Sequence, residues 1–112
     1  MTETEIQTNI MLALSERGAI PIRLNSGRAW QGDFVNGVIR HPRAIRLCPE
    51  GTADVLAIMP GGRVIFIECK TLTGKQREAQ KRFQAAVEKL GHKYYVCRSV
   101  DDVIKIFTNF YK

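Results

Sequence analysis

The sequence is poor in cysteine, has no long apolar run and carries fewer acidic than basic side chains. Its three cysteines, Cys48, Cys69 and Cys97, are odd in number and lack a CxxC or Cys/His spacing, so neither a disulfide framework nor a zinc site is supported. No apolar run is long enough to cross a membrane, and the polar residues 2–5 do not start a signal peptide. We therefore expect a protein of the reducing cytoplasm that has no membrane partner.

The sequence also lacks an interdomain linker, an internal repeat and a low-complexity tract. Its 112 residues are enough for one hydrophobic core, so we expect a single domain over residues 1–112. Seventeen Lys and Arg against eleven Asp and Glu give a formal net charge of +6. This balance favours a polyanionic partner such as nucleic acid, although many other soluble proteins are basic too.

Two acids and a lysine surround one predicted hairpin. Apolar runs at 55–59 and 63–67 indicate two strands joined by the Pro-Gly-Gly turn at 60–62. Pairing of residue 59 with residue 63 places Asp54 opposite Glu68, with Cβ atoms about 4.5 to 5.5 Å apart. Two carboxylates at that separation can share one divalent cation.

The residues that follow Glu68 complete the pattern. Side chains alternate along a strand, so Lys70 lies on the same face as Glu68, and Cys69 points to the other face. An acid-x-base triplet alone is common on exposed sheet faces. An Asp soon after Gly51, a glycine-containing turn, an apolar return strand and this triplet together predict a metal site.

These residues resemble the PD-(D/E)xK nuclease superfamily and, within it, the virus-type replication-repair nuclease branch, VRR-NUC. Residues 51–54 (Gly-Thr-Ala-Asp) correspond to the Gly and Asp of the branch, and residues 68–70 (Glu-Cys-Lys) match ExK. Ala53 departs from the pattern, in which Pro or Ser is more usual. Residues 76–80 resemble the glutamine-bearing helix and residues 91–96 the closing strand.

The resemblance implies an α/β fold with a restriction-endonuclease-like core, a mixed central β-sheet flanked by helices, and an inserted β-hairpin. It implies a DNA endonuclease that uses Mg²⁺ or Mn²⁺ and cuts branched DNA, such as a Holliday junction, as a homodimer in a bacterial or phage-infected cell. The metal ligands would be Asp54, Glu68 and the carbonyl oxygen of Cys69, and Lys70 would orient the attacking water. A nucleic-acid-binding module of the same fold, a nickase without junction selectivity and another metal-dependent enzyme, such as a phosphatase, remain alternatives.

The first predicted helix supplies a further acid. It runs from about Glu3 to Arg17 and ends at Gly18. Glu3 extends the apolar stripe of this helix, where a carboxylate needs a charged partner such as a metal site. Thr2-x-x-Glu5 has the spacing of a capping box, which gives Glu5 a structural role, so Glu3 is favoured over Glu5. The stripe comprises Ile6, Ile10 and Leu14.

The second predicted helix begins at Thr73 and runs to about Leu90. Helical steps back from its apolar stripe place Gln80 and Gln76 on the side that faces the sheet. The stripe comprises Phe83, Val87 and Leu90. We assign Gln80 to orienting water or a backbone phosphate, while Gln76 completes the cap. Candidate phosphate contacts around this turn are Lys75, Lys81 and Arg82.

The middle of the chain predicts a basic hairpin. A half-buried strand is expected at residues 20–24, and Asn36-Gly37 within Phe34–Ile39 is a type I′ turn signal. Arginines around this hairpin could bind phosphates, and Trp30 could stack on an unpaired base. Alternatively, Trp30 packs under the hairpin and the arginines face solvent. The hairpin and the C-terminal aromatic residues at 107, 110 and 111 are candidate dimer surfaces. The arginines are Arg23, Arg28, Arg40, Arg43 and Arg46.

Overall fold

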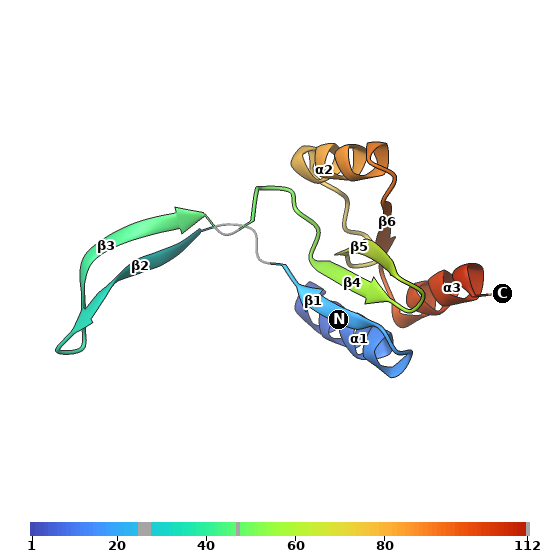
Figure 1. Ribbon diagram of the computed structural model, residues 1–112, viewed down its shortest axis with the longest axis horizontal. Coiled ribbons are helices and arrows are strands. Elements are labelled where there is room, and N and C mark those ends of the chain that lie inside the picture. Colours follow the sequence, from blue (N-terminus) through green and yellow to red (C-terminus); the bar gives the residue numbers. More distant parts are fainter. Residues whose placement is uncertain (25–27, 47, 112) are drawn as a thin grey trace.

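The computed structural model describes residues 1–24, 28–46 and 48–111. Its core is a four-stranded mixed sheet in the order β1-β4-β5-β6, and a two-stranded arm, β2-β3, projects from this core (Figure 1). Neighbouring strands β1, β4 and β5 pair antiparallel, whereas β6 pairs parallel to β5. The core strands are β1 (Ile20–Arg23), β4 (Val55–Met59), β5 (Arg63–Cys69) and β6 (Lys93–Cys97).

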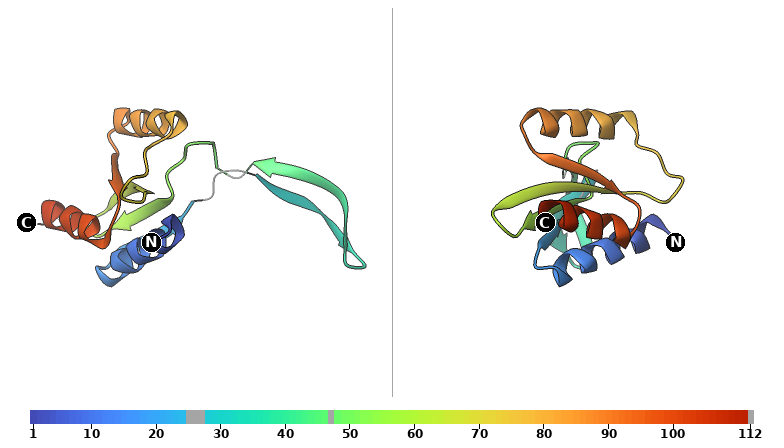
Figure 2. Two further views of the ribbon diagram at one scale, coloured as in Figure 1. Left: turned by 180° about the vertical axis from the view of Figure 1, so that it is seen from behind. Right: turned by 90° about the vertical axis from the view of Figure 1, so that its right-hand side faces the viewer.

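Helices cover both faces of the sheet. Helices α1 (Glu3–Glu16) and α3 (Val100–Phe110) lie together on one face, and α2 (Glu78–Lys89) lies over the other (Figure 2). The mixed sheet between helices is the α/β architecture that the sequence predicted. Among the described residues, no helix is long and apolar enough to span a membrane.

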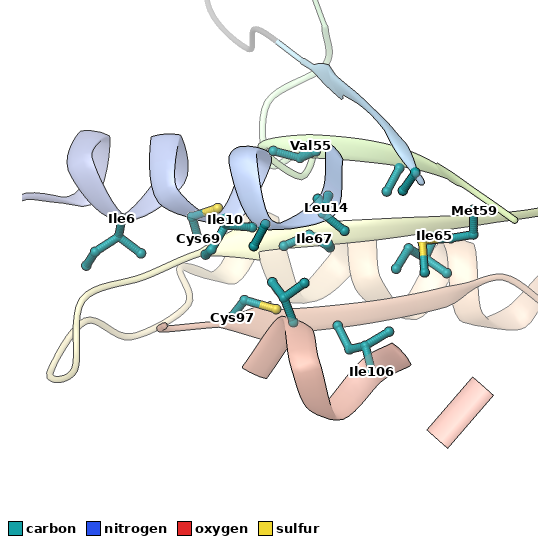
Figure 3. Close-up of a cluster of buried hydrophobic side chains, with 14 residues drawn as sticks. Ile6, Ile10, Leu14, Val55, Met59, Ile65, Ile67, Cys69, Cys97 and Ile106 are labelled. Atoms are coloured by element: carbon teal, nitrogen blue, oxygen red, sulfur yellow. The ribbon is translucent and has the colours of Figure 1, made fainter. Parts of the chain in front are cut away.

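The main hydrophobic core lies between the sheet and the pair α1 and α3 (Figure 3). Ile10 and Leu14 of α1 are fully buried against alternate residues of β4 and β5, among them Val55 and Ile67. Each buried aliphatic side chain contributes about 1.5 to 3 kcal/mol. This stripe fixes the rotation of α1 and therefore the direction in which its first residues point.

The start of α1 matches the sequence prediction. Thr2 is the N-cap, and its Oγ1 accepts a hydrogen bond from the backbone N–H of Glu5 at 3.2 Å. Such a cap contributes about 1 kcal/mol. The helix ends at Glu16, and Gly18 then takes a positive φ of 87°.

Helix α2 begins at Glu78, so the predicted start at Thr73 is wrong. The backbone carbonyls of Thr71, Leu72 and Gly74 accept hydrogen bonds from the Arg98 guanidinium, at 2.7 Å for Gly74. The Gly74 carbonyl, which a helix from Thr73 would pair with a helical N–H group, is therefore satisfied by a side chain from just after β6. This tertiary contact holds residues 71–74 as a loop.

Strand β1 is also more exposed than expected. The sequence alternation predicted a half-buried strand, yet Ile20 and Ile22 are 60% and 43% exposed. In the sheet as described, β1 is an edge strand whose one neighbour is β4. No helix covers the side on which these two isoleucines lie within the described part of the chain.

The arm consists of β2 (Arg28–Val35) and β3 (Val38–Arg46), which are longer than the predicted hairpin. Asn36 and Gly37 have φ values of 51° and 76°, as a type I′ turn requires. A register shift follows at His41, whose φ is also 51°. The arm contributes to a longest molecular extent of 56 Å (Figure 1). The predicted strand break at 25–27 lies outside the described residues.

Candidate metal centre

The hairpin of β4 and β5 has the register that the sequence predicted. Met59 pairs with Arg63 and Val55 with Ile67, so Asp54 and Glu68 continue the same ladder by one position. The Asp54 Oδ2 atom accepts a hydrogen bond from the backbone N–H of Cys69 at 2.8 Å. This bond ties the aspartate to β5 just beyond the paired residues.

Three carboxylates converge at this point. One oxygen from each of Glu3, Asp54 and Glu68 lies within 4.8 Å of the others. Hard divalent cations such as Mg²⁺ and Mn²⁺ prefer oxygen ligands of this kind, so the donor set fits such an ion. Glu3 comes from α1, as expected, whereas Glu5 is not a member of the group. The Glu3 side chain is exposed, which leaves the centre open to solvent on that side.

Glu68 is the buried member of the group, at 1% exposure. Its Oε1 accepts a hydrogen bond from Gln80 Nε2 at 2.9 Å, and its Oε2 accepts one from the Tyr94 hydroxyl at 3.2 Å. Burial, and then the neighbouring Asp54, raise the pKa of Glu68 to about 8. A cation at the centre would replace the proton that this carboxyl holds at neutral pH.

Lys70 and Cys69 lie as side-chain alternation predicted. Lys70 is 7% exposed, and its Nζ is 4.0 Å from Glu68 Oε1. Cys69 points into the main core, where burial raises the pKa of its thiol well above the usual range. A neutral, core-facing thiol is a poor ligand, so only the backbone of Cys69 could serve the centre. Burial likewise raises the pKa of Cys97 to about 12.

Gln80 is fixed at both ends of its amide. Its Oε1 accepts a hydrogen bond from the backbone N–H of Arg77 at 2.8 Å, which caps α2, while its Nε2 donates to Glu68. This arrangement orients the amide without ambiguity, because only the nitrogen can donate. Gln80 therefore lies in the buried site that helical spacing predicted, although the helix starts later.

Gln76 does not complete a helix cap as expected. Its Nε2 donates to Tyr94 Oη at 3.2 Å and to Gln84 Oε1 at 3.0 Å. Burial, followed by the charge of Glu68, raises the pKa of Tyr94 well above its usual range, so the hydroxyl remains a donor. Gln76 thus belongs to a chain of hydrogen bonds that ends on Glu68.

Tyr94 is the site residue that sequence reasoning missed. It lies on β6, and its contact with Glu68 depends on the parallel pairing of β5 and β6, in which Phe66 is the partner of Tyr94. The sequence shows Tyr94 and Tyr95 side by side without indicating which of them faces the acid. Tyr95 packs on the opposite, core side against Phe110.

The structure at Gly51 requires a glycine in the loop before Asp54. Its φ is 87°, and a Cβ at this position would collide with the backbone carbonyl of Ala79 in the first turn of α2. Only glycine combines this conformation with so close an approach. The loop before Asp54 and the helix that carries Gln80 are therefore packed directly together.

The candidate nucleic-acid contacts lie on several separate elements. Arg23 is exposed on β1, and Lys75 and Lys81 are exposed before and on α2, where Lys81 pairs with Glu78 at 3.4 Å. Arg43 is exposed on the arm and donates to Gln31 Oε1 at 3.0 Å. The side chains of Arg28 and Trp30 lie outside the described part of the structure.

The fold is that of a solved structure described as a VRR_NUC domain. The two superpose with a TM-score of 0.67 over 97% of each chain, at 22% sequence identity. A match of this length includes the arm as well as the core. No family model and no curated protein matches the sequence. The fold expected from the motif resemblance is confirmed.

Proposed function

We propose that this protein is a metal-dependent DNA endonuclease that hydrolyses phosphodiester bonds. The observation that carries the proposal is the convergence of Glu3, Asp54 and Glu68 within 4.8 Å, with Lys70 Nζ 4.0 Å from Glu68. Three acids around a cation, with one adjacent amine, suit phosphoryl chemistry better than simple nucleic-acid binding, which needs no buried carboxylate. The VRR_NUC fold supports the same reading.

We assign each residue a role. Asp54, Glu68 and the Cys69 carbonyl would hold Mg²⁺ or Mn²⁺, with Glu3 acting directly or through water. When bound, the ion supplies Lewis acidity toward the scissile phosphate and a lower pKa for a coordinated water. Lys70 would orient the attacking water and offset charge that develops on the phosphorus oxygens. The bonds described above fit Gln80 and Tyr94 as residues that position Glu68.

The first test compares cleavage of plasmid, single-stranded and four-way-junction DNA with and without Mg²⁺ or Mn²⁺. We expect Asp54→Asn and Glu68→Gln to lose both metal binding, read by calorimetry, and cleavage. Lys70→Ala should retain metal binding but lose about 10² to 10³ in turnover. Glu3→Gln should weaken activity, whereas Glu5→Gln, from the same helical turn, is the matched control. Wild-type cleavage by Lys70→Ala would contradict the role of the lysine.

We further propose that the substrate is branched DNA and that two copies act together. The described part of one chain carries one candidate centre, and two cuts on opposite strands are most simply made by two copies related by a twofold axis. The basic arm, which the chain enters just after the Leu24 contact with Asp54, would hold the substrate. If the protein cleaves linear duplex as readily as a junction, it is a nickase without junction selectivity. If it binds DNA without metal and does not cleave it, it is a nucleic-acid-binding module.

DNA affinity should depend steeply on salt, because each phosphate neutralised by Lys or Arg releases counterions. Arg43 is exposed on the arm, and Arg43→Gln should reduce the slope of log K against log salt by about 0.9. Lys105→Gln, an exposed change on α3, is the control and should leave the slope unchanged. An equal effect of both variants, measured by fluorescence anisotropy, would count against the arm as the DNA surface.

A further inference from the structure

Among the described residues, two apolar surfaces have no covering layer, and the first is the tip of the arm. Phe34, Val35 and Val38 are 75%, 44% and 57% exposed. Successive residues of a strand point to opposite faces, so Phe34 and Val35 make both faces of the tip apolar. Residues 34–38 contain no charged side chain.

The second surface is the outer face of β1, β4 and β5. Ile20 pairs with Ile58, which pairs in turn with Val64, so the three side chains form one row across the sheet. They are 60%, 40% and 37% exposed, and Ile22 in the next row is 43% exposed. The four residues lie on the face opposite the main core, and α2 packs instead near β6. We call the surface formed by Ile20, Ile22, Ile58 and Val64 the open face.

The arm is a single two-stranded sheet, and no other part of the described chain packs against it. A two-stranded hairpin is marginally stable in water unless it packs against something else. Figures 1 and 2 show β2 and β3 extending away from the core, and among the described residues no core helix or strand packs along them. The tip and the open face of one chain are therefore too far apart to cover each other.

Charge decides which kind of partner suits these surfaces. Polyanionic DNA would gain nothing from the tip or the open face, because neither contains a cation, whereas Arg40 and Arg43 lie further along the arm. An apolar protein surface suits both, and each chain offers one of each kind. We propose that two copies exchange arms, so that the tip of each arm docks on the open face of the other copy. This refines the homodimer of the proposed function.

The geometry allows the exchange. The shorter molecular extents are 31 and 29 Å. Arm strands of eight and nine residues at about 3.3 Å per residue reach about 26 to 30 Å, close to these widths, so a tip can extend over the sheet face of a neighbouring copy. A twofold axis makes the contact reciprocal and closes the assembly at two copies. Pro21 lacks an N–H on edge strand β1, which favours docking on the face over pairing at the edge.

Arm exchange would also link the two metal centres. The chain enters the arm after Leu24, whose backbone N–H donates to the Asp54 carbonyl at 2.8 Å. The root of each arm is thus attached beside a candidate ligand, and its tip would be attached to the other copy. The two centres would be held in a fixed relation, as paired cutting of two strands requires.

The experiment introduces opposite charges on the two surfaces and measures oligomeric state by sedimentation at micromolar protein. Val38→Asp and Ile58→Lys should each weaken self-association about 100-fold or more, because an unpaired charge is buried. A mixture of the two variants should form a heterodimer, with one wild-type contact and one Asp–Lys contact. Leu12→Lys, an exposed change on α1 across the sheet, is the control and should remain dimeric.

Each other outcome overturns the exchange. A monomeric wild type would exclude arm exchange. If the two variants are folded but form no heterodimer when mixed, the pairing of tip with open face is refuted. Loss of the dimer in Ile58→Lys alone indicates contact between two open faces. If both variants remain dimeric and Val38→Asp alone binds a junction more weakly, the tip inserts into DNA. Sedimentation needs no cleavage, so failure of the nuclease proposal would not be mistaken for failure of the exchange.

Discussion

Glu68 should make the stability of the metal-free protein depend on pH around neutrality. Burial, and then Asp54, raise its pKa from 4.5 to about 8 in the fold, while the unfolded chain retains the ordinary value. The folded state therefore binds more protons than the unfolded state between these values. Stability from the protonated carboxyl is fully present below pH 4.5 and is lost as the pH rises through about 8.

The size of the effect follows from the two pKa values. Their difference corresponds to about 5 kcal/mol, at about 1.4 kcal/mol per pH unit, as an upper limit for a carboxyl that stays buried after ionisation. Water that enters through the open side near Glu3 reduces it, and we expect a loss of about 2 to 4 kcal/mol. At about 4 °C per kcal/mol, the melting temperature should fall by roughly 8 to 16 °C.

The assay is thermal and urea unfolding between pH 5 and 8.5 in the presence of a chelator. Glu68→Gln removes the ionisable group, so its stability should vary much less over this range, while Glu5→Gln should follow the wild type. Mg²⁺ should restore stability to the wild type most strongly at high pH, where the carboxylates are free to bind it. Equal pH dependence in wild type and Glu68→Gln would refute the assignment to Glu68.

Two further substitutions test the supports of the centre. Gly51→Ala should lower the free energy of unfolding in urea by about 2 to 4 kcal/mol, because the φ of 87° strains any other residue and the new Cβ would collide with the backbone of Ala79. A change below about 0.5 kcal/mol would contradict this packing. Tyr94→Phe removes one donor to Glu68 and should lower metal affinity about 10-fold in calorimetry while the fold persists; unchanged affinity would show that Gln80 alone positions the carboxylate.

The sequence was sufficient for the parts of the site that depend on local periodicity. Alternation along a strand placed Glu68 and Lys70 on one face, and a tight turn set Asp54 opposite Glu68. Helical spacing from the apolar stripe of α1 likewise placed Glu3, and not Glu5, at the centre. These relations need only the period of each element and one turn.

The parts that were not predicted depend on contacts between distant segments. The loop before the late start of α2 is held by Arg98, which binds the carbonyls of Thr71, Leu72 and Gly74 from just after β6. Tyr94 reaches Glu68 only through the parallel pairing of β5 and β6. Leu90, which was expected in the apolar stripe of α2, is 77% exposed because the helix ends there. No local pattern contains these partners.

The late start of α2 also connects the stability of the helix with the geometry of the metal centre. Gln80 occupies the position at which one amide can cap the Arg77 N–H and donate to Glu68 together. A helix that began at Thr73 would form its cap elsewhere and leave this amide without a fixed orientation. Arg98 binds carbonyls of the loop that precedes this helix, so it supports the segment that leads to Gln80. The buried acid is thus held by contacts from α2 and β6 as well as by its own strand, and this explains how the fold can keep an ionisable group at 1% exposure.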